Sequence, residues 1–143
     1  MPRSLSHRSN ISSNQRFCYR SHRHYSLYSL HYWQDISHKL ARSHITTEAV
    51  FLLADHVLTT LGYRRWQWRC NSRHEPSRRA ATRFGFTFEG IFRNHMVVKG
   101  ENRDTAWYSI IDSEWPPIRA RFQCWLAPAN FDAQGRQRTR LSH

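Results

Sequence analysis

Apolar residues between positions 47 and 61 recur in steps of three and four, as in the run TTEAVFLLADHVLTTL. That spacing predicts an α-helix over 47–61 with one buried face. Thr46 and Thr47 are residue types that cap helix N-termini. Glu48 suits a first turn, and Gly62 suits the left-handed residue that ends a helix. The apolar face comprises Ala49, Val50, Leu52, Leu53, Val57, Leu58 and Leu61.

A two-residue alternation follows in RRWQWRC at 64–70. It predicts a β-strand, because successive side chains of a strand point to opposite faces of a sheet. Pro76 suits the first turn of a helix, which we expect to continue through SRRAATRF and to stop at Gly85. The two faces of the strand would carry Trp66, Trp68 and Cys70 on one side and Arg65, Gln67 and Arg69 on the other.

The second half of the chain has the pattern of a β-hairpin followed by a helix. Alternating aromatic residues in FGFTFEGIFRNHMVV predict a strand, with a bulge or bend at Gly90. The residues KGEN predict a turn, and RDTAWYSIID predicts the returning strand. We expect Ser113 to cap a last helix that has Pro116 and Pro117 in its opening turn. Its buried side is expected to carry Ile118, Phe122 and Trp125.

The predicted order is helix, strand, helix, strand, strand, helix, which is typical of a mixed α/β domain. We expect the strands linked by a helix to be neighbours and parallel, and the closing hairpin to be antiparallel. A length of 143 residues fits one domain with a sizeable core. We divide the chain into a basic Ser/His/Arg-rich arm at 1–35, either disordered or supplying one strand, a core at 36–126 and a polar tail at 127–143.

Basic residues outnumber acidic ones, and the formal net charge is +12. Such a surplus suits a polyanionic partner, either nucleic acid or a multiply phosphorylated cofactor, and does not choose between them. The arm also holds one cysteine and several histidines at spacings that match no zinc pattern, so we interpret it as a basic segment without a metal. The residues weighed for that zinc site are Cys18, His22, His24 and His31.

The cysteines Cys18, Cys70 and Cys124 show no paired or metal-like spacing, which favours reduced thiols in an intracellular protein. No apolar run is long enough for a membrane helix, and the N-terminus lacks the apolar centre of a signal peptide. We therefore expect a cytoplasmic protein. The Arg- and Ser-rich start leaves a mitochondrial transit segment as the minor alternative.

The loop at 42–47 runs into the predicted helix and has the chemistry of an anion site. The first turn of a helix leaves backbone N–H groups without intrahelical partners, and the helix dipole adds a fractional positive charge there, which suits phosphate. Arg42 and His44 would add positive charge. The alternative is an ordinary capped helix whose N–H groups are satisfied by its own threonines and water. The hydroxyl donors at this loop would be Ser43, Thr46 and Thr47.

Three pieces of sequence, taken together and at their spacing, resemble the GNAT N-acetyltransferase superfamily and its RimJ/RimL-like branch. They are TEA at the start of the first helix, PSRRAATRFGFTFEG as helix, GF and strand, and RDTAWYSIIDSEWP as the closing strand and its exit. The resemblance covers about residues 36–141. It implies a mixed sheet flanked by helices, acetyl-coenzyme A as donor, no metal, and a primary amine as acceptor, either a protein N-terminus or a small amine.

The resemblance also assigns roles to residues. The coenzyme diphosphate would lie on the loop before the first helix, where the superfamily has Gln or Arg, then Gly, then Gly or Ala, at places that fall on Ala41, His44 and Thr46. His74 holds the place of an asparagine that touches the pantetheine arm, and Ser77 fits a place near the thioester sulfur. The coenzyme-binding residues implied are Arg42, Ser43, His44, Ile45, Thr46, Thr47, His74, Ser77 and Arg78.

The mechanism implied by the resemblance is direct attack of a neutral amine on the thioester carbonyl, with a base that removes the ammonium proton. Ser77 is the candidate for stabilising the thiolate, because the tyrosine that many superfamily members use would fall at Ala81. Alternatively, Ser77 is only the first-turn serine of a helix. Glu89 is the candidate base, and His95 and Asp112 are the alternatives.

The strands that precede this region in relatives are not recognisable in residues 1–34. We therefore expect a sheet that is incomplete at its N-terminal side, with an open edge that invites a homodimer. Three functions stay open: an active N-acetyltransferase, a truncated or degenerate GNAT-like protein without catalysis, and a basic RNA- or ribosome-binding module. The chain contains no recognisable RNA-binding motif.

Overall fold

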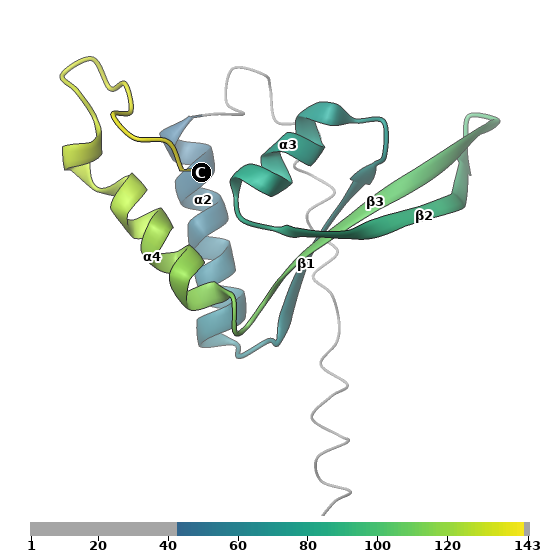
Figure 1. Cartoon of the computed structure of the whole chain (residues 1–143), viewed down its shortest axis with the longest axis horizontal. Helices are drawn as coiled ribbons and strands as arrows, with labels where there is room; N and C mark the ends of the chain where they lie inside the picture. Colours follow the sequence, from purple (N-terminus) through teal and green to yellow (C-terminus); the bar gives the residue numbers. More distant parts are fainter. Residues whose placement is uncertain (1–42, 142–143) are drawn as a thin grey trace, which may run out of the picture.

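The structure, a computed structural model, describes residues 43–141 and consists of a three-stranded sheet packed against helices (Figure 1). The expected mixed α/β order of elements is confirmed. The arm at 1–35 and the coenzyme candidate Arg42 lie outside the described residues, so what we expect of them stays a prediction. In chain order the elements are α2 (His44–Asp55), η3 (His56–Thr60), β1 (Arg65–Asn71), α3 (Glu75–Arg83), β2 (Thr87–Val98), β3 (Glu101–Ile111), α4 (Trp115–Leu126) and η4 (Pro128–Asn130).

The start of α2 differs from the prediction, since the helix begins at His44 and not at Thr47. Ser43 is extended, with ψ 159°, and its hydroxyl oxygen accepts the backbone N–H of Thr46 at 3.2 Å. Ser43 is therefore the N-cap, and Thr46 and Thr47 lie inside the first turn. A serine followed by two threonines offers several residues of the capping type, and the spacing of the apolar residues did not decide among them.

A short π turn, η3, continues α2 and ends where the sequence predicted. The N–H of Leu61 donates to the carbonyl of His56 at 2.8 Å, and Gly62 then takes the left-handed φ of +65° that terminates the helix. The predicted apolar face was too wide, because Leu52 and Leu61 are exposed. The residues of α2 and η3 that enter the hydrophobic core are Val50, Ala54, Val57 and Leu58.

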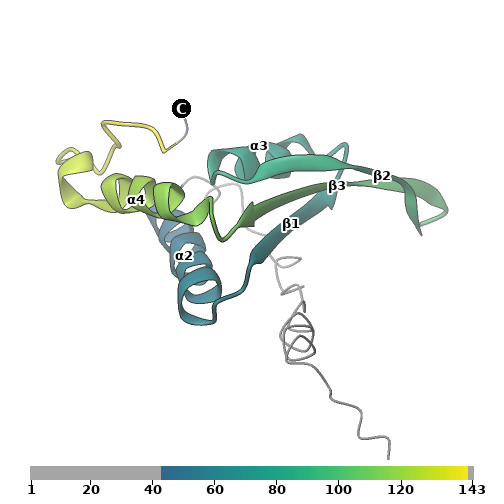
Figure 2. The same cartoon turned by 60° about the horizontal axis from the view of Figure 1, so that its bottom comes forward.

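The sheet has the order β1–β3–β2, and both of its ladders are antiparallel. Figure 2 shows β3 between the other two strands. β1 and β2 therefore run in the same direction, as expected for strands joined by a helix, but they are not neighbours, which corrects the prediction. Gly90 lies at a break in the β2–β3 register next to Phe88, so the predicted bulge is confirmed. A second irregularity falls between Phe92 and Met96.

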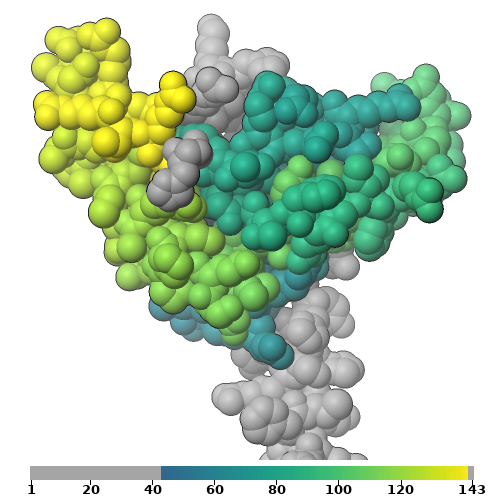
Figure 3. Space-filling view, viewed as in Figure 1, coloured from purple at the N-terminus to yellow at the C-terminus, as the bar shows by residue number. Residues whose placement is uncertain are grey.

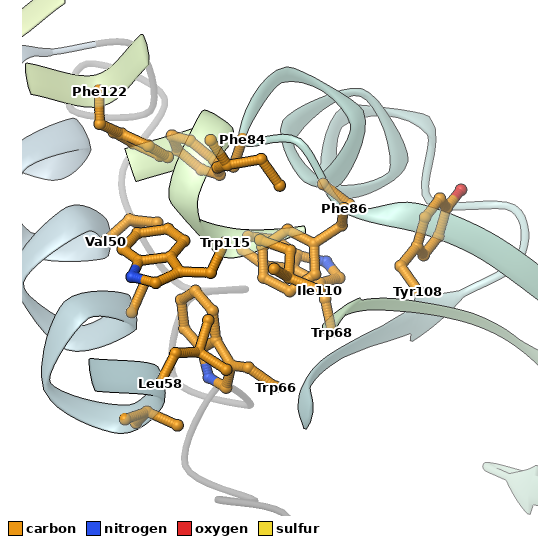
Figure 4. Packing of buried hydrophobic residues seen from close by; sticks show 14 of the residues in the cluster. Val50, Leu58, Trp66, Trp68, Phe84, Phe86, Tyr108, Ile110, Trp115 and Phe122 are labelled. Carbon is orange, nitrogen blue, oxygen red and sulfur yellow. The ribbon is translucent and has the colours of Figure 1, made fainter. Parts of the chain in front are cut away.

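One face of the sheet is buried under the helices. Trp66, Trp68 and Cys70 of β1 are buried, as their alternation predicted, and they pair across the ladder with Ile110, Tyr108 and Ala106 of β3. Figure 4 shows these aromatic side chains between the strands and the helices. The helices add residues to the same cluster, and they include Val50 and Leu58, Ala81 and Phe84, and Trp115 and Phe122.

The last helix, α4, confirms its predicted buried side and corrects its predicted cap. Ile118, Phe122 and Trp125 are buried, and the prolines lie in the first turn. Glu114, and not Ser113, occupies the N-cap position. Residues 127–141 then fold back as a small C-terminal lobe, which Figure 3 shows in yellow beside α4.

The C-terminal lobe is anchored by polar contacts and by the apolar side chains of Phe131 and Leu141. The Asn130 side chain accepts the backbone N–H of Thr139 at 2.9 Å and donates to the carbonyl of Trp125 at 2.9 Å. Leu141 is buried. The lobe is therefore packed structure at least as far as Leu141.

Candidate functional site

The N-terminal turn of α2 uses most of its hydroxyl groups internally. Ser43 donates its hydroxyl hydrogen to Thr46 Oγ1 at 3.1 Å, and Thr47 donates its own to the carbonyl of Ser43 at 3.0 Å. The side chains of Thr46 and Thr47 are buried. The hydroxyl hydrogens of Ser43 and Thr47 are thus engaged within the turn of the free protein, and their role as donors for an anion stays a prediction.

Backbone N–H groups are the donors that remain at this turn. The N–H of Thr46 is bonded to the Ser43 hydroxyl, and the N–H of Thr47 to the Ser43 carbonyl. Within the described part of the chain, the N–H groups of His44 and Ile45 make no hydrogen bond. At the positive end of a 12-residue helix, two such groups attract an anion.

The imidazole of His44 is held against α4 and the C-terminal lobe. Its ring stacks on Trp125 at a centroid distance of 5.9 Å and meets Phe131 edge-on at 5.0 Å. Its Nδ1 lies 3.7 Å from the carboxylate of Glu48. These contacts fix the side chain on one flank of the turn.

Arg83, the last residue of α3, brings a positive charge to the same turn. Its two terminal nitrogens donate to Thr47 Oγ1 at 3.2 and 3.1 Å. Sequence reasoning missed this residue, because the two partners are 36 positions apart and no local pattern joins them. The only sequence signal was a basic residue in the last turn of a predicted helix.

Ser77, the candidate for stabilising the thiolate, is buried at the beginning of α3. Its hydroxyl oxygen accepts the indole N–H of Trp68 at 3.1 Å. Burial raises the pKa of the neighbouring Cys70 thiol, and a hydrogen bond with Ser77 opposes that rise. His74 is the residue before the helix, and its carbonyl accepts the N–H groups of Ser77 and Arg78 while its imidazole makes no capping bond.

Arg78 is turned toward the sheet. Its Nε donates to the phenol oxygen of Tyr108 at 3.2 Å, and a terminal nitrogen donates to the carbonyl of Ser72 at 3.4 Å. The hydrogen bond with Tyr108 raises the pKa of Arg78. Six residues of helix separate Ser77 from Arg83, a rise of about 9 Å. The structure therefore places Ser77 and Arg78 at one end of α3, and the contact with α2 at the other end.

Glu89, the candidate base, forms an ion pair across the sheet. Arg65 donates to both of its carboxylate oxygens, and the hydroxyl of Ser109 donates to one of them at 2.6 Å. The hydrogen bonds from Arg65 hold the pKa of Glu89 below its ordinary value. The Arg65 and Ser109 positions lie on the face opposite Trp68, so Glu89 and Ser77 are on opposite sides of the sheet.

The alternative bases differ in their surroundings. His95 lies with its Nδ1 2.8 Å from Thr105 Oγ1, and Phe92 and Trp107 flank its ring. Asp112 is exposed and accepts the N–H of the next residue in a turn. Among residues 43–141, no helix is long and apolar enough to cross a membrane, and no group of His, Cys, Asp and Glu side chains is arranged to hold a metal ion.

Comparison with known proteins gives one family match. A sequence model described as acetyltransferase (GNAT) domain matches residues 13–87, so the match begins upstream of residue 36, where the resemblance in the sequence began. A GCN5-related N-acetyltransferase from Brucella melitensis is 57% identical, covers 74% of the chain and has a TM-score of 0.69. No curated protein matches the chain.

Two further solved structures are similar to the chain. A probable acetyltransferase of the GNAT family from Chromobacterium violaceum is 55% identical over 52% of the chain, with a TM-score of 0.50. RimJ from Mycobacterium smegmatis, in complex with CoA-disulfide, is 26% identical over 58% of the chain, with a TM-score of 0.51. The chain spans 46%, 37% and 40% of the three solved relatives, in the order given, which is less than half of each.

Proposed function

The chain belongs to the GNAT acetyltransferase family, and we propose that it transfers the acetyl group of acetyl-coenzyme A to a primary amine. The observation that carries the proposal is the match of residues 13–87 to the GNAT domain, which spans more than half of the chain. The similarity to RimJ in complex with CoA-disulfide supports coenzyme A as the ligand and the RimJ/RimL-like branch. We propose a protein N-terminus or a small amine as the acceptor.

The N-terminal turn of α2 fits the coenzyme diphosphate. Two residues with bulky side chains stand where the superfamily has small ones, but both side chains turn aside. The ring of His44 packs on Trp125 and Phe131, and the side chain of Thr46 is buried. The N–H groups of His44 and Ile45 then remain to bind a phosphate, and Arg83 is bonded to Thr47 of the same turn. We call the N–H groups of His44 and Ile45 together the α2 phosphate site.

Ser77 would act at the other end of the coenzyme. When bound, acetyl-coenzyme A supplies an acetyl thioester, whose sulfur carries negative charge as the acyl group leaves. The oxygen of Ser77 already accepts a bond from Trp68, which orients the hydroxyl. Its hydrogen is directed to the Cys70 sulfur in the free protein, so it would stabilise the leaving sulfur after turning from Cys70 to the ligand. Because the pantetheine arm is a long chain, one coenzyme molecule would reach both Ser77 and the α2 phosphate site at the other end of α3.

The proton of the acceptor ammonium needs a base on this chain or near it. Glu89 has a lowered pKa and is held by Arg65, so it accepts a proton less readily than a free carboxylate does. His95 contacts Thr105, which is on the same face of the sheet as Ser109 and Glu89, and since its Nδ1 is engaged there, Nε2 is the nitrogen that would take the proton. We propose His95 as the first candidate and keep Glu89 as the second.

A thermal shift measurement tests the coenzyme part of the proposal. A ligand at 100 times its dissociation constant stabilises a protein by about 2.7 kcal/mol, which corresponds to a rise in melting temperature of roughly 8 °C for a domain of this size. Acetyl-coenzyme A should give a rise of that order, and pantetheine, which lacks the phosphates, should give a much smaller one. No shift with millimolar acetyl-coenzyme A would reject the proposal.

An activity measurement separates an enzyme from a degenerate relative. Release of free coenzyme A thiol should depend on an added amine, for which a peptide with a free N-terminus and spermidine are the first two probes. Coenzyme binding without amine-dependent thiol release would indicate a degenerate GNAT-like protein that lacks catalysis.

A further inference from the structure

A chain of polar contacts joins the end of α3 to the cap of α2. Arg83 donates two hydrogen bonds to Thr47 Oγ1, and the same hydroxyl donates to the carbonyl of Ser43. Thr47 is fully buried, so the alternative to these bonds is not solvation by water. The position of the Arg83 side chain therefore constrains the Thr47 hydroxyl, and the Thr47 hydroxyl constrains Ser43, the N-cap of α2.

The guanidinium of Arg83 itself contacts two aromatic rings. Its central carbon lies 5.1 Å from the ring centroid of Phe84 and 5.3 Å from that of Trp125. Trp125 is fixed in turn, because its indole N–H donates to the side chain of Gln137 in the C-terminal lobe at 2.8 Å. A planar cation that already packs on aromatic rings loses little freedom when it donates two hydrogen bonds, so the group is oriented in advance.

The charge of Arg83 acts on two helices in opposite senses. At the C-terminal end of α3 a positive charge is stabilising, whereas at the N-terminal end of α2 it adds to the positive end of the helix dipole. An anion at that turn would be attracted by both positive charges.

We propose that Arg83 is the positioning residue of the α2 phosphate site: through Thr47 it fixes the first turn of α2, so that the N–H groups of His44 and Ile45 are aligned before the coenzyme binds. This inference rests on the proposed function for its ligand, but the contact that it invokes exists in the free protein. The C-terminal lobe also contributes to the position of Arg83, because Gln137 of the lobe binds the indole of Trp125, on which the guanidinium packs.

The first test is made on the full chain without ligand. Amide hydrogen exchange at Thr46 and Thr47 should become about tenfold faster in Arg83→Met and in Thr47→Val, since each removes the bond that ties the turn to α3. The control is Arg79→Met, which removes an exposed charge from the same helix that is paired only loosely with Glu75, at 3.8 Å. Unchanged exchange in Arg83→Met and Thr47→Val would overturn the proposal.

The second test measures coenzyme A binding by calorimetry in the same variants. Arg83→Met and Thr47→Val should each weaken binding by about tenfold, and the double variant should be no weaker than either one, because both changes break one linkage. Arg83→Lys keeps the charge without the two-pronged bond and should also bind weakly. Full affinity in Arg83→Lys would show that Arg83 acts by its charge alone. Additive losses in the double variant would show that Arg83 and Thr47 act independently. Either result would overturn the positioning role.

The two tests distinguish failure of the proposed function from failure of the positioning role of Arg83. Absence of binding in the wild-type protein would reject the proposed function, while the exchange rates at Thr46 and Thr47 would still decide whether Arg83 fixes the turn.

Discussion

Replacement of Ser77 by alanine separates the structural from the catalytic role of that residue. The hydroxyl of Ser77 accepts the indole N–H of Trp68, and the two residues are only 8% and 6% exposed. Ser77→Ala therefore leaves a buried donor without a partner, which costs about 1–3 kcal/mol. We expect urea unfolding to show that loss, with a fall in melting temperature of about 3 °C for each kcal/mol.

A double-mutant cycle with Trp68→Phe assigns the loss to this bond. If the hydrogen bond is the cause, Ser77→Ala should cost less in the Trp68→Phe background, and the coupling energy should exceed about 0.5 kcal/mol. A coupling energy below about 0.3 kcal/mol would refute the structural argument. Turnover measured well below the melting temperature adds the catalytic readout. A larger loss of kcat in Ser77→Ala than in Trp68→Phe indicates stabilisation of the thiolate, and equal kcat in both indicates a structural role only.

Two further predictions concern stability. Hydrogen bonds from Arg119 lower the pKa of Asp55, so the pair stabilises the protein above the ordinary carboxyl pKa and loses that contribution as pH falls through the folded pKa. Asp55→Asn should thus be less stable than wild type at pH 7, with a difference that shrinks below about pH 4 in acid unfolding curves; a constant difference would contradict the linkage. Gly85→Ala should destabilise by more than about 1 kcal/mol in urea, because φ is +90° and a Cβ would meet Arg121 at 2.5 Å and Ile118 at 3.3 Å. Wild-type stability would contradict that prediction.

The parts of the fold that the sequence predicted are those decided by near neighbours. The faces of β1 were correct because alternation along a strand is a local property of the backbone. The bulge at Gly90 and the helix end at Gly62 were correct because glycine is the residue that such conformations favour. The order of the strands was wrong in one respect, since the insertion of β3 between β1 and β2 depends on pairing between distant residues.

The candidate site shows the same division. Residues at the start of α2 could be named from a helix pattern, but the use of their hydroxyls could not, because that depends on which residue becomes the N-cap. Glu89 looked like a free carboxylate until the register placed Arg65 beside it, 24 positions earlier in the chain. Arg83 was missed for the same reason, since its partner Thr47 belongs to another helix.

The strand order also bears on how the protein is made. β3 is the middle strand of the described sheet and the last of its strands to leave the ribosome. Until Ile111 has been synthesised, neither β1 nor β2 has its partner strand within residues 43–141. During translation β1 therefore exposes its tryptophans without hydrogen bonds to β3. Because the β2–β3 hairpin closes over a short loop and β1 must pair across a longer one, we expect the hairpin to form first and β1 to join it later.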